Sequence, residues 1–149
     1  MLYEVKSGKR LTKDKIVVGM LSYEVITFLH NRGVEIHTKE IYINHKGLSH
    51  LARDSKNTRG AGLTYDDILK IPDILKEPSY VYFDKNKTKL NLLFCKNKKE
   101  CEKVIKIVVD TKHTRKKEKL TLIKTAGYVV EANIKKGGFI KVVEDMESR

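Results

Sequence analysis

The chain has 149 residues and a hydrophobic fraction of 40%, which is enough for one hydrophobic core and too apolar for a chain disordered throughout. Lys and Arg number 31 against 19 Asp and Glu, which gives a formal net charge of +12. The apolar runs are short and interrupted by charges, so neither a signal peptide nor a membrane span is expected. We therefore expect a single domain over residues 1–149, either cytoplasmic or delivered as an effector or virion-associated domain.

The positive charge favours a polyanionic partner, because neutralised phosphates release their counterions. The alternative is a lysine-rich composition that reflects only an AT-rich genome, with every lysine solvated. An acidic protein partner would use the same charge, and charge does not separate RNA from DNA. Nucleic acid is the interpretation that we favour.

The two cysteines, Cys95 and Cys101, do not form a Cys-x-x-Cys pair and have no histidine at ligand spacing. Zinc binding is therefore poorly supported, and two thiols do not make a disulfide framework. We expect reduced structural cysteines, with no metal or other cofactor.

The first 44 residues predict one helix and one short strand. Apolar side chains recur with helical period over residues 14–30, where Thr12 would cap the helix and Gly33 would end it. The stretch "EIHTKEIYIN" then alternates apolar and polar residues, which predicts a strand with Ile36, Ile41 and Ile43 facing inward.

Three short helices are expected next. The first covers residues 48–57 within "LSHLARDSKNTRGAGLT", and "RGAG" then interrupts the chain. Thr64, with Asp67 three residues on, is typical of a capping box at the start of the next helix. Pro72 splits "YDDILKIPDILKEP" into two pieces.

The second half of the chain predicts strands. "YVYF", "LNLLF", "KVIKIVVD", "KLTLIKTAGYVV" and "FIKVV" are β-branched or aromatic runs separated by lysine-rich turns. The charged runs "KNKKE" and "TRKKEK" are expected at solvated hairpin turns, although a role in holding a polyanion stays open. The chain thus predicts an α+β fold, with N-terminal helices packed on a C-terminal antiparallel sheet of about four to five strands.

The helix expected over residues 48–57 carries the side chains that most strongly indicate a function. Residues three and four apart share a helix face, so His50, Arg53, Asp54 and Asn57 are expected to cluster. Asp54 would accept a proton from one ring nitrogen of His50 and orient the ring, leaving the other nitrogen for proton transfer.

Cations surround this histidine in the sequence. Arg53 would grip a phosphate through two parallel hydrogen bonds, while Lys56 and Arg59 would add positive charge. Gly60 and Gly62 would let the backbone approach a ligand. The alternative is an ordinary solvated helix surface with a structural histidine.

This segment resembles a phage-associated family of nucleases in the barnase, EndoU, colicin and RelE superfamily of RNases. Its pattern is a His, two residues, Arg-Asp, one residue, Lys, two residues and Arg-Gly, which His50, Arg53, Asp54, Lys56, Arg59 and Gly60 match in order. The similarity extends over "TYDDILKIPDILKEP", "VYFDKNKTKLNLLF" and "TLIKTAGYVV", about residues 41–143. It implies an RNase-like core over residues 45–145.

The resemblance implies metal-independent RNA cleavage, in which a ribose 2′-OH attacks the adjacent phosphate and leaves a 2′,3′-cyclic phosphate. His50 would then be the base or the acid, and Arg53, Lys56 and Arg59 would bind the phosphate. The superfamily also implies a hydroxyl and an aromatic on a late strand, for which Thr125 and Tyr128 are the candidates. Tyr128 is equally well explained as a half-buried sheet aromatic.

Strand geometry separates these late residues. In a regular strand Lys124 and Tyr128 face one way and Thr125 the other, unless a bulge intervenes at Gly127. Lys124 is a further candidate for phosphate binding. His113 is a candidate second acid or base, although a histidine at a turn is usually solvated.

The other histidines are weaker candidates. His45 resembles His113 in this respect, while His30 and His37 look incidental.

The favoured function is an endoribonuclease of toxin or effector type with RNA as substrate, opposed by an acidic immunity or antitoxin protein if one exists. A basic nucleic-acid-binding module without catalysis is the main alternative, although no finger, RNP-like motif or helix-turn-helix is evident. A metal-dependent nuclease would need converging carboxylates, and Asp66 and Asp67 are better explained by a helix start. A structural virion component stays open.

Overall fold

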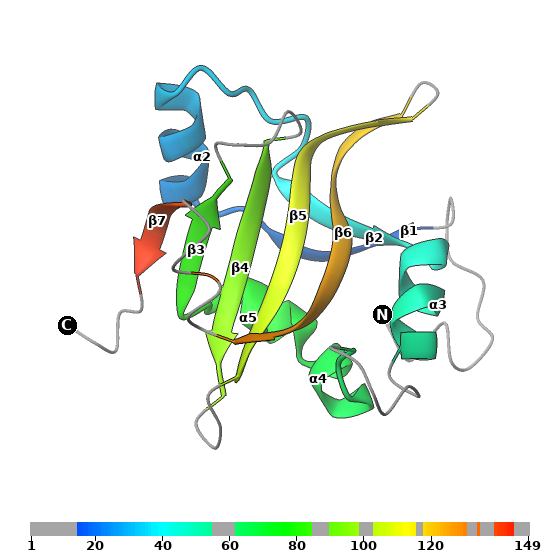
Figure 1. Cartoon of the computed structure of the whole chain (residues 1–149). Helices are drawn as coiled ribbons and strands as arrows, with labels where there is room; N and C mark the ends of the chain where they lie inside the picture. Colours follow the sequence, from blue (N-terminus) through cyan, green and yellow to red (C-terminus); the bar gives the residue numbers. More distant parts are fainter. Residues whose placement is uncertain are drawn as a thin grey trace.

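The computed structural model describes residues 15–54, 62–84, 90–98, 103–115, 118–130, 134 and 139–144. Within them, the strands are β1 (Lys15–Met20), β2 (Glu40–Asn44), β3 (Tyr80–Phe83), β4 (Asn91–Asn97), β5 (Lys103–Arg115), β6 (Glu118–Val130) and β7 (Ile140–Glu144). The helices are α2 (Tyr23–Asn31), α3 (His45–Asp54), α4 (Tyr65–Leu69) and α5 (Ile71–Lys76). The chain is thus an α+β protein (Figure 1).

The first predicted helix is wrong in its N-terminal half. Residues 15–20 form β1, and α2 begins only after Ser22, whose side-chain oxygen accepts a hydrogen bond from the Val25 backbone N–H at 3.2 Å. The expected cap, Thr12, lies outside the described residues. Gly33 follows α2 with φ of 79°, a left-handed conformation that suits glycine, so the predicted helix end is confirmed.

The second predicted element is confirmed in part. β2 buries Ile41 and Ile43 as expected, but Ile36 precedes the strand and packs against the core from the connecting segment. β2 pairs antiparallel with β1 and parallel with β6. The N-terminal part of the chain therefore extends the sheet instead of only covering it.

The sheet is larger than expected and is mixed rather than antiparallel. Its described strands run in the order β1-β2-β6-β5-β4-β3-β7, which makes seven where four or five were predicted. The parallel β2–β6 pair joins residues about 80 positions apart, and hairpin patterns in a sequence carry no signal for such a pairing.

The two helices around Pro72 form as predicted. Thr64 accepts a hydrogen bond from the Asp67 backbone N–H at 3.2 Å and thereby caps α4. Pro72 lies in the first turn of α5, where its missing N–H costs no helical hydrogen bond. Gly19 lets α5 approach β1, because a Cβ at this glycine would lie 3.2 Å from Leu75 Cβ.

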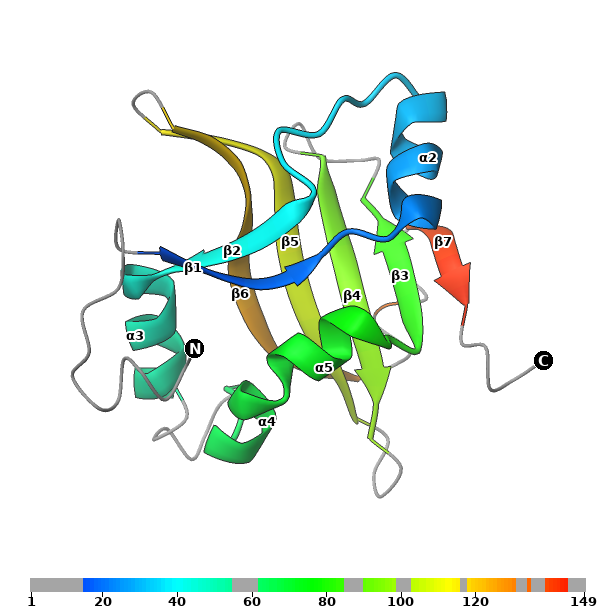
Figure 2. The same ribbon diagram turned by 180° about the vertical axis from the view of Figure 1, so that it is seen from behind.

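The main core lies between the helices and one face of the sheet, which α5 crosses (Figure 2). Leu92 and Phe94 of β4 point into this core, while Leu93 and Cys95 point into a smaller cluster on the opposite face. β4 is therefore buried on both sides, which explains its continuous apolar run. Among the described residues, no helix is long and apolar enough to cross a membrane.

Candidate functional site

Helix α3 presents the predicted histidine and arginine to solvent. The Asn44 side chain accepts a hydrogen bond from the Gly47 N–H at 2.7 Å, so the helix starts three residues before the predicted Leu48. Leu48 and Leu51 are buried, and α3 packs against β2 and β6 through them. The opposite face of this amphipathic helix exposes His50 and Arg53.

His50 contacts Arg53 along the helix. Arg53 Nη2 lies 3.3 Å from His50 Nδ1, and because a guanidinium can only donate, Nδ1 accepts. The neutral ring then carries its proton on Nε2. We expected Asp54 to orient the ring, but its side chain lies outside the described part of the chain, as do Lys56, Arg59 and Gly60.

A β-bulge in β6 changes where the late-strand residues point. Val108 of β5 pairs with Thr125 and Val109 with Ile123, so Lys124 is the extra residue. Lys124 and Thr125 are both exposed. The expectation that Lys124 and Tyr128 share a face is therefore wrong, because the bulge occurs at Lys124 and not at Gly127.

The register of β2 places the start of α3 beside this bulge. Tyr42 of β2 pairs with Leu122 of β6 in parallel, so Asn44, at the end of β2, is level with Lys124. α3 begins at the next residue, and His50 follows five residues later, about 7.5 Å of helix rise. The start of α3 therefore lies near the bulged part of β6, and Figure 1 shows α3 beside the β2–β6 part of the sheet.

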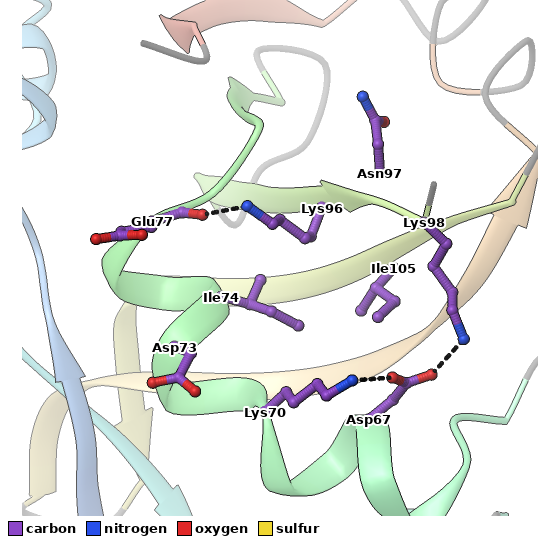
Figure 3. A pocket seen from close by; sticks show the side chains of 9 residues that line it. All are labelled: Asp67, Lys70, Asp73, Ile74, Glu77, Lys96, Asn97, Lys98 and Ile105. Carbon is purple, nitrogen blue, oxygen red and sulfur yellow. Dashed lines mark hydrogen bonds and ion pairs between the residues drawn. The ribbon is translucent and has the colours of Figure 1, made fainter. Parts of the chain in front are cut away.

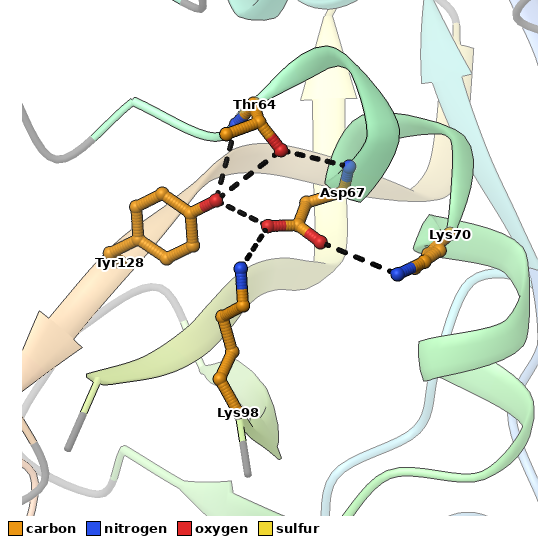
Figure 4. A network of polar contacts seen from close by, with 5 residues as sticks. All are labelled: Thr64, Asp67, Lys70, Lys98 and Tyr128. Carbon is orange, nitrogen blue, oxygen red and sulfur yellow. Dashed lines mark hydrogen bonds and ion pairs between the residues drawn. The ribbon is translucent and has the colours of Figure 1, made fainter. Parts of the chain in front are cut away.

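Tyr128 is half-buried and joins β6 to the start of α4 (Figure 4). Its hydroxyl donates a hydrogen bond to Asp67 Oδ2 and accepts one from the Thr64 N–H at 3.3 Å. Only one of the two hydrogen bonds of the predicted capping box is therefore direct. Thr64 caps the helix, but Asp67 reaches the Thr64 N–H through the tyrosine hydroxyl.

Asp67 is the buried anion of this network, with its side chain only 4% exposed. Lys98 Nζ lies 2.9 Å from Asp67 Oδ2, and Lys70 Nζ lies 3.9 Å from Oδ1. Burial alone would raise the pKa of Asp67, but hydrogen bonds from Tyr128 and Lys98 outweigh it and hold the pKa below its ordinary value. The hydrogen bond to Asp67 likewise raises the pKa of Lys98.

The ring of Tyr128 also faces two cations. Lys98 Nζ lies 5.1 Å and Lys103 Nζ 5.8 Å from the ring centroid, within the range of cation–π attraction. Sequence reasoning assigned Asp67 only to the helix start and missed Lys98. Nothing in the lysine-rich run around Lys98 distinguishes it, since its role depends on contacts with distant segments.

His113 lies away from this group of residues. It pairs with Leu120, eight residues along β5 from Ile105, the partner of Tyr128, which corresponds to roughly 26 Å of strand. Near it, His37 Nε2 contacts Thr114 Oγ1 at 3.2 Å, and burial followed by the charge of nearby lysines lowers the pKa of His37.

Other candidate groups take no part in the site. Burial raises the pKa of the Cys95 thiol to about 12, as expected for a structural cysteine, while Cys101 is outside the described residues. In the described ranges, no three His, Cys, Asp or Glu side chains come together as metal ligands.

The fold and the positive charge are consistent with an α+β protein that acts on nucleic acid. Comparison with protein families defines which class of protein this is. Residues 15–136 match the family described as phage-Barnase-EndoU-ColicinE5/D-RelE like nuclease3, so the chain belongs to this nuclease family. The match includes β1 and α2, which lie before the region of resemblance noted in the sequence. No curated protein and no solved structure shows significant similarity to the chain.

Proposed function

We propose that this nuclease is an endoribonuclease that cleaves RNA without a metal ion, by attack of a ribose 2′-OH on the adjacent phosphate. The observation that carries the proposal is the exposed His50–Arg53 pair on α3, a helix that packs against β6. An imidazole beside a guanidinium supplies proton transfer and phosphate binding at one place.

In the proposed reaction, a base takes the proton of the 2′-OH, and the 2′ oxygen bonds to phosphorus. The bond from phosphorus to the 5′ oxygen breaks, and an acid protonates this leaving oxygen. The products are a 2′,3′-cyclic phosphate and a 5′-hydroxyl. His50 performs one of the two proton transfers in this scheme.

Arg53 controls the availability of His50. The contact between Arg53 Nη2 and His50 Nδ1 is long, at 3.3 Å, and a phosphate oxygen is a much stronger acceptor for a guanidinium than a neutral ring nitrogen. A phosphate bound by Arg53 would therefore draw the guanidinium away from Nδ1. The phosphate would thus replace Nδ1 of His50 as the acceptor of Arg53.

The remaining candidates bind or position the substrate. Lys124 and Thr125, both exposed at the bulge, offer an ammonium and a hydroxyl to the phosphate. Lys56 and Arg59 of the family pattern would add cations. Tyr128 acts as a positioning residue in this proposal, because its hydroxyl is engaged with Asp67 and Thr64.

The test uses purified protein with a single-stranded RNA and a DNA of the same sequence, in EDTA. His50→Ala and Arg53→Ala are each expected to slow RNA cleavage by about 10²-fold or more, the usual range for loss of a proton-transfer group and of a group that stabilises transition-state charge, respectively. Lys46→Ala on the same helix and His30→Ala on α2 serve as matched controls and should cleave at the wild-type rate. Product ends are identified by mass spectrometry.

Cleavage of RNA alone, with cyclic-phosphate ends and loss in the two α3 variants, is the expected result. Cleavage of DNA, or cleavage that appears only with added magnesium, would contradict the mechanism. Binding of RNA without cleavage under both conditions would leave a non-catalytic nucleic-acid-binding module.

A further inference from the structure

A concave site lies beside the Tyr128 network, which is formed by Thr64, Asp67, Lys70, Lys98 and Tyr128. A cavity of about 480 Å³ opens between the α4–α5 segment and the ends of β4 and β5, which is within the range of small-ligand sites. It shares Asp67, Lys70 and Lys98 with the network (Figure 3). The other residues that line it are Lys70, Asp73, Ile74, Glu77, Lys96, Asn97 and Ile105.

The charges around this cavity balance. Three lysines and three carboxylates line it, so the cavity does not have the excess of cations that a dedicated phosphate site needs. Lys98 and Lys70 lie at one end beside Asp67, and Asp73 and Glu77 lie at the other (Figure 3). Such a site suits a neutral ligand that carries both hydrogen-bond donors and acceptors.

Its floor is apolar. Ile74 of α5 and Ile105 of β5 are 4% and 3% exposed, and both lie at the centre of the cavity between the charged ends. Lys96 is held at the rim, where its ammonium donates to the Glu77 backbone oxygen at 3.1 Å. An apolar floor with polar ends matches a planar ring whose edge forms hydrogen bonds.

We propose that this cavity binds a nucleobase of the substrate strand. The ring face would lie on the two isoleucines, ring carbonyls would accept from the lysines, and amino groups would donate to Asp73 and Glu77. The inference rests on the proposed function for the identity of the strand. Base binding in the cavity would give the nuclease a base preference, whereas α3 and the β6 bulge would bind only the sugar–phosphate backbone of the RNA.

The experiment measures binding by fluorescence anisotropy with 2′-O-methyl tetranucleotides, which cannot be cleaved because the attacking hydroxyl is blocked. Four homotetramers are compared with an abasic tetramer that carries the same phosphates. Asp73→Asn, Glu77→Gln and Lys96→Gln alter the cavity, while Asp66→Asn and Lys76→Gln make the same charge changes outside it.

The wild-type protein should bind its preferred homotetramer about tenfold or more tighter than the abasic tetramer. Each cavity variant should weaken that preference by roughly 3- to 10-fold, the value of one hydrogen bond, and the controls should leave it unchanged. Equal binding of abasic and intact tetramers, or equal effects of cavity and control variants, would overturn the proposal.

Cleavage and base binding can fail separately. Base-dependent binding by a protein that never cleaves RNA would support the cavity and refute the proposed reaction. Cleavage of RNA by a protein that shows no base preference would support the proposed reaction and refute base binding in the cavity.

Discussion

Replacing Tyr128 by Phe tests how the candidate site is held together. The change removes one hydroxyl, which donates to the buried Asp67 carboxylate and accepts the Thr64 N–H. A hydrogen bond to a charged group contributes about 1.5–3 kcal/mol, so the free energy of unfolding at pH 7 should fall by about that amount. Lys98 keeps its contact with the carboxylate, so the effect should stay within this range.

The effect of Tyr128→Phe should also depend on pH. The pKa of Asp67 is depressed in the folded chain, so the hydroxyl–carboxylate bond contributes fully above about pH 4 and weakens as the carboxylate becomes protonated in more acidic solution. The assay is urea unfolding followed by far-ultraviolet circular dichroism at pH 7 and at pH 3 or below. Tyr23→Phe is the control, because Tyr23 is 83% exposed. An unchanged stability, or a loss that is equally large at both pH values, would refute this account of the network.

Three further predictions concern stability and reactivity. Asp67→Asn should lower the free energy of unfolding by about 1–3 kcal/mol at pH 7. Its stability should also fall less than that of the wild type on acidification below about pH 4, as checked by urea midpoints, because the unfolded wild-type chain binds the extra proton. Gly33→Ala, at φ of 79°, should cost about 1–2 kcal/mol by the same assay, and an unchanged midpoint would argue against that backbone conformation. In a Cys101→Ser variant, Cys95 should react with Ellman's reagent only on unfolding, since it is buried and its pKa is about 12; rapid reaction of the folded protein would contradict this.

The sequence predicted those elements whose signals are local. β-branched runs marked the strands of the second half, Thr64 marked the start of α4, and Pro72 marked the start of α5. The error at residues 14–30 arose because Ile16, Val17, Met20 and Leu21 fit a helical period by chance. The consecutive β-branched residues 16–18 and the Ser22 cap were the signals that favoured a strand followed by a helix.

The candidate site was predictable only where its residues lie close together in the sequence. His50 and Arg53 are three apart on one helix, and helical geometry alone brings them into contact. The bulge at Lys124 is set by the register between β5 and β6, which no local pattern encodes. The contacts of Asp67 with Lys98 and Tyr128 join residues 31 and 61 positions apart, so they appear only when the sheet is formed.

The contacts between residues far apart in the sequence suggest why the Tyr128 network matters for a nuclease of this family. α4 has five residues, far fewer than the roughly 12–15 that a helix needs to be even marginally stable alone, so tertiary contacts must hold it. Those contacts include the relay from Thr64 and Asp67 to Tyr128. Lys56 and Arg59, which we propose as further phosphate-binding residues, lie between α3 and Thr64 in the sequence. α3 packs on β2 and β6, and Tyr128 of β6 contacts Thr64, so the described residues before and after that segment contact the same sheet. Tyr128→Phe should therefore slow RNA cleavage as well as lower stability, and a variant that is destabilised yet cleaves at the wild-type rate at low temperature would show that the network serves the fold alone.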